Sequence, residues 1–474
     1  SLLTSSYVFH KIELATPIGN LRLCMWFLEG FEVDVARLPA EQADIETMST
    51  NSAEKNDSNT YWEFSPSGEY TVPTESMDVV RVRSRFLGFL HRLTQGEKKK
   101  ESPLDPTDDL LSLSGERLTK AVPAPDWEQA ATLFEQRVRP WLETETPSTS
   151  VVFYVAPPYS GREEILRHWA GANKVSVLKE PTTEAILGDS SKWLRAWPRK
   201  GPWVLPQLER CFLRHASGLG LVRELLSGMM SGDLGRGIVG CDSWAWAYLQ
   251  HVLPNRSSFT LSAKAFDAQR LQELFSENIF DQHGLRARFR QADNGAYLFP
   301  ERQEGDDVDA ADGFWRGLAA RSRGNVGVAG AYWKRALRTL PEKELGEQEA
   351  ESRQSELEQA KPGYAASRHA ASRQSKWATI WVTPWEDMLQ PALPKGSGES
   401  ELFVLQALLL HGGLSEVGLK RTLPFDRASI TEVLHFLAER EFVARTDGRW
   451  YVTAYGYPTV RAALKTSDYL CDEF

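Results

Sequence analysis

Short runs of apolar residues alternate with stretches of helical periodicity in the middle of the chain. Four of these runs have the length of strands and fall at Val151–Val155, Lys174–Leu178, Trp203–Leu205 and Gly237–Cys241. Strands that are separated by helices pair in parallel, because each helix returns the chain across the face of the sheet before the next strand begins. The pattern therefore predicts an α/β core built on a parallel sheet.

The last hundred residues follow a different pattern. Leu402–Leu410 and Ser429–Arg440 have helical periodicity, and they are followed by two strand-like runs, Phe442–Thr446 and Arg449–Thr453. Between these runs lies Asp447-Gly448, a dipeptide typical of a tight hairpin turn. Helix, helix and hairpin in this order predict a winged-helix domain, which also takes in the strand-like run Trp377–Val382.

The two ends of the core are bordered by more polar sequence. Strand-like runs separated by turns in the first hundred residues predict a small β-containing module, followed by an Arg-rich helix at 79–93. An amphipathic helix, Trp127–Leu142, leads into the core. Residues 342–361 are nearly devoid of apolar side chains, so they form a polar linker or a solvated helix.

Composition narrows the classes of function. A net charge of −9 with a pI near 5.7 argues against nonspecific coating of nucleic acid. The four cysteines have no CxxC spacing, and no His, Cys or acidic motif has metal-ligand spacing, so we expect no metal site and a reducing, cytoplasmic location. No apolar run approaches the roughly 20 residues that cross a bilayer. Because the chain begins at Ser1, a missing upstream membrane segment stays open.

The first core strand leads into a loop that has the context of a phosphate-binding loop. Such a loop follows GxxxxGK[ST], with glycines that let N–H groups approach phosphate, a Lys for the β and γ phosphates, and a hydroxyl for Mg²⁺. The loop here matches the pattern only at Gly161. The residues of this degenerate phosphate loop are Ala156, Ser160, Gly161, Arg162 and Glu163, with Ala156 at the first glycine, Arg162 at the Lys and Glu163 at the hydroxyl.

The acid that would organise Mg²⁺ and water is also displaced. The third strand ends in Pro206-Gln207, and the nearest acid is Glu209. The fourth strand delivers Asp242 and Ser243 to the carboxyl edge of the sheet, where they are candidate sensor residues. An equally good interpretation of Asp242 is an N-cap for the following helix.

The chain resembles AAA+ and STAND P-loop NTPases in three features. They are the strand, loop and helix at 151–170, the fourth strand with its candidate sensor residues, and the segment Phe314–Leu337 with its Gly324-Asn325 turn. The resemblance covers about residues 149–460 and implies lid helices that carry Arg321 and Arg323. The expected fold is an α/β P-loop-NTPase-like parallel sheet with a helical lid, a C-terminal winged helix and a small β-containing N-terminal module. The expected parts are the module (1–100), a linker with the amphipathic helix (101–148), the core (149–310), the lid (311–341), a polar linker (342–374) and the winged helix (375–474).

Three functional hypotheses follow. The leading one is a regulatory or scaffolding ATPase-like protein that does not hydrolyse ATP, needs no cofactor and acts through protein contacts in a larger assembly, with a homo-oligomer left open. The second is an ATP-binding, origin-recognition-like DNA-binding protein, in which Arg162 contacts phosphate and a basic hairpin contacts the nucleic-acid backbone through Arg286, Arg288 and Arg290. The third is the cytoplasmic part of a membrane-anchored sensor. The helix Ser429–Arg440 would be the recognition helix of the winged-helix domain, and the acidic residues in and near it favour protein contacts over nucleic acid.

Overall fold

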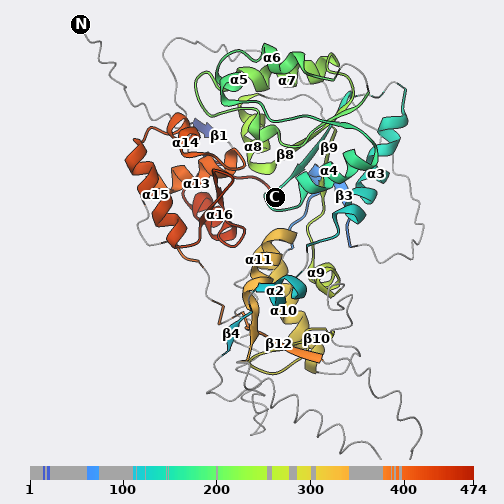
Figure 1. Ribbon diagram of the computed structural model, residues 1–474, viewed down its shortest axis with the longest axis vertical. Coiled ribbons are helices and arrows are strands. Elements are labelled where there is room, and N and C mark those ends of the chain that lie inside the picture. Colours follow the sequence, from blue (N-terminus) through green and yellow to red (C-terminus); the bar gives the residue numbers. More distant parts are fainter. Residues whose placement is uncertain are drawn as a thin grey trace, which may run out of the picture.

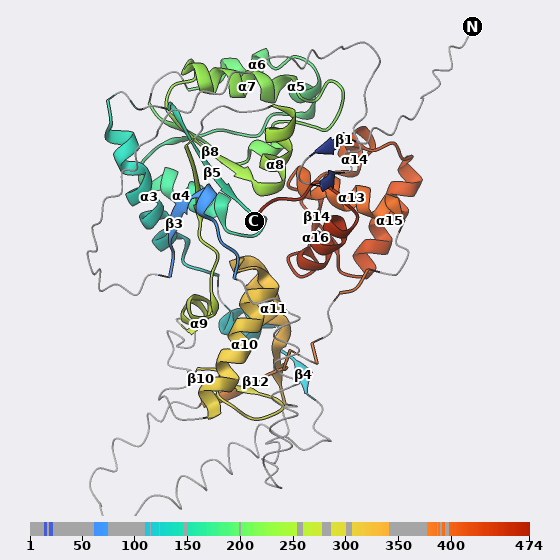
Figure 2. The same ribbon diagram turned by 180° about the vertical axis from the view of Figure 1, so that it is seen from behind.

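The structure is a computed structural model whose elements form three groups around the C-terminus (Figure 1, Figure 2). They are a core around a six-stranded sheet, a second lobe that contains α10 and α11, and a C-terminal helical lobe. The described residues are 14–16, 19–21, 61–73, 110–113, 115–122, 124–145, 147, 149–198, 201–253, 259–276, 286–299, 306–340, 377–385, 387–388, 391–393 and 398–474. The predicted helix at 79–93 and the polar segment 342–361 lie outside these residues.

The core sheet has the strand order β3-β9-β5-β8-β7-β6. Five strands run parallel, and the four predicted from sequence are present as β5 (Val151–Ala156), β6 (Ser176–Val177), β7 (Trp203–Leu205) and β8 (Gly237–Asp242). The fifth parallel strand, β9 (Phe259–Ala263), was not predicted. The predicted α/β class with a largely parallel central sheet is therefore confirmed.

Aromatic side chains fix the helices to the two faces of this sheet. Phe153 and Tyr154 are neighbours in β5, so their side chains point to opposite faces. Phe153 packs against Trp246 of α8 (Ser243–Val252), whereas Tyr154 packs against Phe134 of α3 (Trp127–Glu143). Phe134 also contacts Trp169 of α4 (Arg162–Ala172). Helices α3 and α4 therefore cover one face and α8 the other.

One edge of the core sheet comes from the N-terminal part of the chain. Strand β3 (Phe64–Pro66) pairs antiparallel with β9, with Phe64 opposite Ala263, and is followed by the short helix η1 (Ser67–Glu69). Tyr61, Trp62 and Phe64 are buried in the common core. Nearer the N-terminus, β1 (Leu14–Thr16) and β2 (Gly19–Leu21) pair antiparallel around the predicted turn. Residues 64–66 thus belong to the core sheet, and Tyr61 and Trp62 pack in its hydrophobic core.

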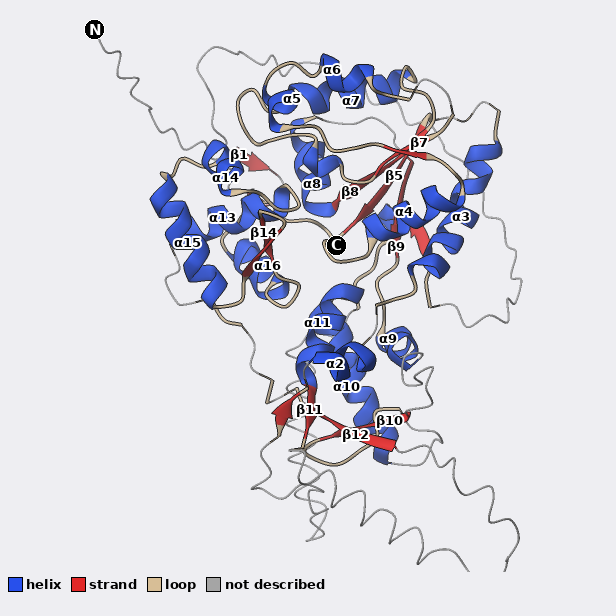
Figure 3. Ribbon diagram, viewed as in Figure 1, coloured by secondary structure: helices blue, strands red, loops and turns tan. Residues whose placement is uncertain are grey.

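The second lobe combines three helices with a sheet. Helices α9 (Ala268–Ser276), α10 (Asp306–Ser322) and α11 (Val326–Ala336) pack beside strands in the order β10-β12-β11-β4 (Figure 3). The strands are β10 (Arg286–Gln291), β12 (Trp377–Val382), β11 (Leu337–Thr339) and β4 (Leu111–Ser112). The predicted basic hairpin forms only in part: an isolated antiparallel bridge joins Arg290 to Tyr297 on one edge of β10, and the other edge of β10 pairs in parallel with β12.

The C-terminal lobe has three helices and then a hairpin, whereas the sequence predicted two helices before the hairpin and missed the second of the three, α14. Its elements are α13 (Glu399–Leu410), α14 (Glu416–Thr422), α15 (Arg427–Glu439), β13 (Val443–Thr446), β14 (Arg449–Val452) and α16 (Tyr457–Thr466). Asp447 and Gly448 both have positive φ, at 49° and 77°, as a tight hairpin turn requires. The predicted strand at 377–382 lies in the sheet of the second lobe instead.

Five further helices complete the described chain. They are α2 (Gly115–Ala121), α5 (Thr183–Leu187), α6 (Ser191–Arg195), η2 (Leu208–Arg210) and α7 (Gly220–Ser231). Within the ranges given above, no helix combines the length and the apolar character needed to cross a bilayer.

Candidate functional site

The loop between β5 and α4 has a glycine where no other residue fits. Gly161 precedes the first turn of α4 with φ of +78°, a left-handed conformation that is unfavourable for residues with a Cβ. A Cβ built on Gly161 would lie 2.0 Å from Cζ3 of Trp127. The aromatic ring of Trp127 therefore covers the loop at the start of the helix.

Arg162 is turned inward and forms a buried ion pair. Its side chain donates a hydrogen bond from Nη2 to Oε1 of Glu209, and its Nη1 lies 3.8 Å from Oδ2 of Asp242. The second carboxylate oxygen of Glu209 accepts the backbone N–H of Asp242 at 3.1 Å. Arg162, Glu209 and Asp242 are 8%, 1% and 4% exposed, so water contributes little to balancing their charges.

Burial and mutual attraction set the charges of this cluster. Burial raises the pKa of Asp242 well above its usual range, and the positive charge of Arg162 offsets only part of that effect. Burial lowers the pKa of Arg162, but Glu209 and Asp242 outweigh it and leave that pKa raised. The guanidinium thus stays charged, and its countercharge is supplied by the protein.

Glu163 replaces the hydroxyl that would hold Mg²⁺. Its Oε2 accepts a hydrogen bond from Nε2 of Gln207 at 2.6 Å, and its Oε1 lies 2.7 Å from the guanidinium of Arg167. In the described ranges, no group of three or more His, Cys, Asp or Glu side chains could hold a metal ion. The carboxylate of Glu163 is thus held by Gln207 and Arg167.

The N-terminus of α11 closes over the same loop. Asn325 caps this helix by accepting the N–H groups of Gly327 and Val328, both at 3.1 Å, and it donates from Nδ2 to the carbonyl of Pro158 at 2.6 Å. The N–H of Gly327 donates to the carbonyl of Tyr159 at 3.1 Å. The second lobe is thus hydrogen-bonded to the loop.

Two further residues of the predicted phosphate loop, Ala156 and Ser160, are also buried. Ala156 ends β5, and Ser160 is 8% exposed with a hydroxyl that has no hydrogen-bond partner within the described part of the chain. The ring of Tyr159 meets the ring of Tyr457 from α16 at a centroid distance of 6.0 Å. The C-terminal lobe therefore reaches the loop as well.

The two candidate sensor residues have partners within the fold. Asp242 accepts the N–H of Trp244 at 3.0 Å, so the N-cap interpretation is confirmed, and a sensor role stays a prediction. The hydroxyl of Ser243 donates to the carboxylate of Asp472, which also pairs with Arg461 at 2.9 Å. Asp472 belongs to the segment after α16, so this edge of the core sheet is covered by C-terminal residues.

The predicted lid arginines contact the C-terminal lobe. Arg321 donates to the hydroxyls of Tyr332 and Thr459 at 3.0 and 2.9 Å, and Arg323 donates to the carbonyl of Phe474. To bind a phosphate, either arginine would first have to break these hydrogen bonds.

The three arginines of β10 differ in their surroundings. Arg288 is exposed, whereas Arg290 donates to the carbonyl of Gly295 and lies over the rings of Tyr297 and Trp381. The side chain of Arg286 lies outside the described residues. Arg290 is thus engaged within the second lobe.

Sequence reasoning missed three residues of the site. Glu209 was noted only as the nearest acid, and the covering role of Trp127 and the Pro158 contact of Asn325 were not foreseen. Glu209 lies just after the buried strand β7, and the carboxyl ends of parallel strands meet at the same edge of a sheet, so this position is the signal that could have suggested the ion pair.

The sequence matches no protein-family profile and no curated protein. Among solved structures, it is similar to the RuvB Holliday junction branch migration motor of Thermotoga maritima, with 13% identity, 74% of this chain and 99% of the other covered, and a TM-score of 0.28. It is also similar to a Walker-type ATPase of Pyrococcus abyssi (11% identity, 72% and 96% covered, TM-score 0.26) and to Cdc6p of Pyrobaculum aerophilum (12%, 74% and 98%, 0.27). At TM-scores this low the likeness carries no argument, and the fold assignment rests on the strand order and the loop.

Proposed function

We propose that this protein is a regulatory, ATPase-like scaffold that does not hydrolyse ATP and acts through protein contacts in a larger assembly. The observation that carries the proposal is the buried ion pair between Arg162 and Glu209. A phosphate-binding cation has to be free to meet phosphate, whereas this one is balanced by carboxylates of its own core. If Arg162 turned toward a phosphate, Glu209 would stay buried without its partner, which would cost about 3–5 kcal/mol.

The other loop positions support the same proposal. Pro157 and Pro158 supply no N–H groups to a phosphate. Glu163 puts a negative charge at the position where Mg²⁺ and the γ phosphate would meet a neutral hydroxyl. Repulsion between this carboxylate and a triphosphate acts against binding before any chemistry begins.

The hairpin of the C-terminal lobe favours protein contacts over DNA contacts. Arg449 donates to Glu180 of the core at 2.9 Å, and Arg210 of the core pairs with the same carboxylate. Arg210 also donates to the hydroxyl of Tyr451 at 3.3 Å. Because the hairpin is docked on the core, it would have to detach before it could contact a nucleic-acid backbone.

Isothermal titration with ATP and with a nonhydrolysable analogue, each with and without Mg²⁺, tests the proposal. We expect no Mg²⁺-dependent binding in the micromolar range and no phosphate release at saturating ATP. Arg162→Lys, which keeps the positive charge, and Arg167→Lys, its exposed counterpart on α4, serve as controls and should give the same result. Micromolar, Mg²⁺-dependent binding that changes with Arg162→Lys but not with Arg167→Lys would refute the proposal and support the ATP-binding alternative.

A further inference from the structure

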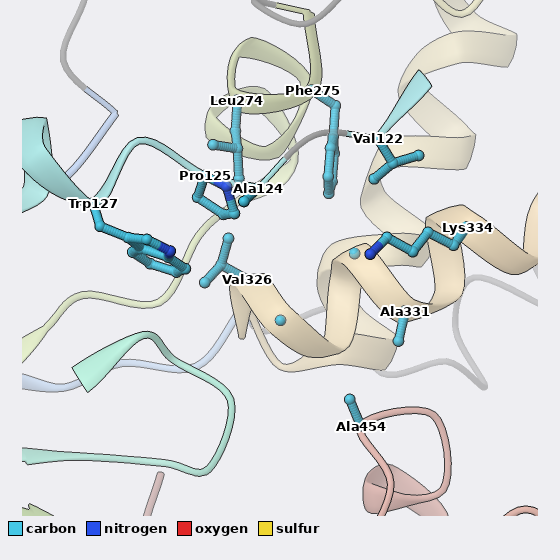
Figure 4. Close-up of a pocket in the computed structure, with 12 residues that line it drawn as sticks. Val122, Ala124, Pro125, Trp127, Leu274, Phe275, Val326, Ala331, Lys334 and Ala454 are labelled. Atoms are coloured by element: carbon cyan, nitrogen blue, oxygen red, sulfur yellow. The ribbon is translucent and has the colours of Figure 1, made fainter. Parts of the chain in front are cut away.

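A pocket of about 320 Å³ lies where three parts of the molecule meet (Figure 4). Its walls come from the segment before α3 and the start of α3, from α9 and α11 of the second lobe, and from the C-terminal lobe. Lining residues from these parts include Val122, Trp127, Phe275, Gly330, Lys334 and Ala454. The volume is at the lower end of the range of about 300–1,000 Å³ that is usual for small-molecule sites.

The pocket has flat, mostly apolar walls. Trp127 and Phe275 present aromatic rings, and Figure 4 shows the ring of Phe275 pointing into the space above α11. A planar ring can pack against such surfaces with little loss of conformational freedom. The walls therefore favour an aromatic ligand over a flexible chain.

Gly330 keeps this space open at the expense of helix stability. A glycine inside an α-helix is less favourable than alanine by roughly 0.5–1 kcal/mol. Gly330 has no positive φ, and a Cβ built on it would meet no atom within 4 Å, so neither backbone strain nor packing requires a glycine here. A role in keeping the pocket unfilled accounts for it.

Lys334 supplies the charge. Of the described residues that line the pocket, it is the only one with a charged side chain, and its nitrogen end points toward the space beside Phe275 (Figure 4). No hydrogen bond or ion pair is assigned to its ammonium group within the described residues. A ligand anion at this position would gain both charge complementarity and a hydrogen bond.

Trp127 closes the pocket on the side of the loop. The same indole that lines the pocket covers Gly161, so a wall separates the cavity from the start of α4. A single lysine balances one negative charge, and no further lining cation continues from it toward the loop. The pocket thus fits one ring with one anionic group and does not fit a polyphosphate chain.

We propose that this pocket binds a small aromatic carboxylate, with its ring between Trp127 and Phe275 and its carboxylate at Lys334. Occupancy would connect the second lobe to the C-terminal lobe through Ala454, which precedes Tyr455 in the chain. Tyr455 already accepts a hydrogen bond from Tyr332 of α11 at 3.1 Å. The bound ligand therefore reinforces an existing contact between these lobes, and the proposal does not depend on whether the loop binds ATP.

Titration calorimetry of the full chain with 2-naphthoate tests this proposal. We expect one site with a Kd of about 1 mM or tighter. Gly330→Leu should fill the cavity and weaken binding at least tenfold, whereas Gly313→Leu, at an exposed α10 glycine with equally open space, should leave the Kd unchanged. Lys334→Met should weaken naphthoate binding about two- to fivefold and leave the uncharged 2-naphthol unaffected.

Gly330→Ala is the control for the possibility that Gly330→Leu loses binding only because it misfolds. It adds one methyl group to the pocket and improves helix propensity, so it should melt no lower than the wild type and still bind naphthoate more weakly. Absence of naphthoate binding, an unchanged Kd in Gly330→Leu, or tighter binding of adenosine than of naphthoate would each overturn the proposal.

Discussion

Replacing Arg162 by methionine distinguishes a structural role of this side chain from a phosphate-binding role. A side chain reserved for a phosphate contributes little to folding, and removing it leaves the free energy of unfolding almost unchanged. In this structure Arg162 is the partner of buried Glu209 and lies beside buried Asp242. Removing Arg162 leaves the buried carboxylate of Glu209 without its ion-pair partner, which should lower the free energy of unfolding by about 3–5 kcal/mol.

That loss is large enough to read from a melting curve. For a cooperative unit of 150–250 residues, about 1 kcal/mol corresponds to roughly 2–4 °C in Tm, so we expect a decrease of about 6–20 °C in scanning calorimetry. Arg167→Met on the same helix is the matched control. Its side chain is 54% exposed, and its pairing with Glu163 contributes less than about 1 kcal/mol.

A second variant identifies the cause of the loss. Arg162→Met combined with Glu209→Gln removes both charges and keeps an oxygen that can accept the N–H of Asp242. We expect the double variant to recover more than half of the decrease in Tm, because the unpaired carboxylate is gone. A Tm for Arg162→Met within about 2 °C of the wild type, or a double variant less stable than the single one, would refute the structural role.

Three further changes test other parts of the site. Burial raises the folded-state pKa of Asp242, so the wild type loses stability as the pH rises above about 4. Asp242→Asn removes the titrating group, and its Tm should exceed that of the wild type by an amount that grows in melts from pH 4 to pH 8. Gly161→Ala should lose at least about 2 kcal/mol through its positive φ and contact with Trp127, and Trp127→Ala should reduce that loss in a double-variant cycle. Asn325→Ala should lose about 1–3 kcal/mol in urea unfolding, whereas Asn325→Asp, which keeps the cap but not the donor to Pro158, should lose less; an Asn325→Asp variant as stable as the wild type would exclude a contribution from that contact.

Among the predicted strands of the core, those buried on both faces have the clearest sequence pattern. Strands β5, β7 and β8 are buried at every position, so each appears as a continuous apolar run. Strand β9 contains the polar residues Thr260 and Ser262 and begins with an exposed residue, so it does not appear as a continuous apolar run. Strand β3 includes Pro66, a residue that demotes a run to an edge strand, and its partner lies far along the chain.

The contacts of the candidate site were not predicted from the sequence. The sequence places Arg162 after a buried strand, and the pattern of a phosphate loop assigns it to a ligand. Its actual partner depends on how close the ends of β5, β8 and β7 lie to one another, which follows from the strand order and not from sequence spacing. The same holds for Asn325, whose cap is readable from its neighbours, whereas its bond to Pro158 depends on how the lobes dock.

The edge strand β3 has a consequence for synthesis of the chain. Phe64 leaves the ribosome about 200 residues before its partner Ala263, which at roughly 5–20 residues per second is an interval of about 10–40 s. During that interval the side chains of Tyr61, Trp62 and Phe64 have no β9 to pack beside. These apolar side chains are therefore exposed to aggregation and to chaperones until β9 has been synthesised.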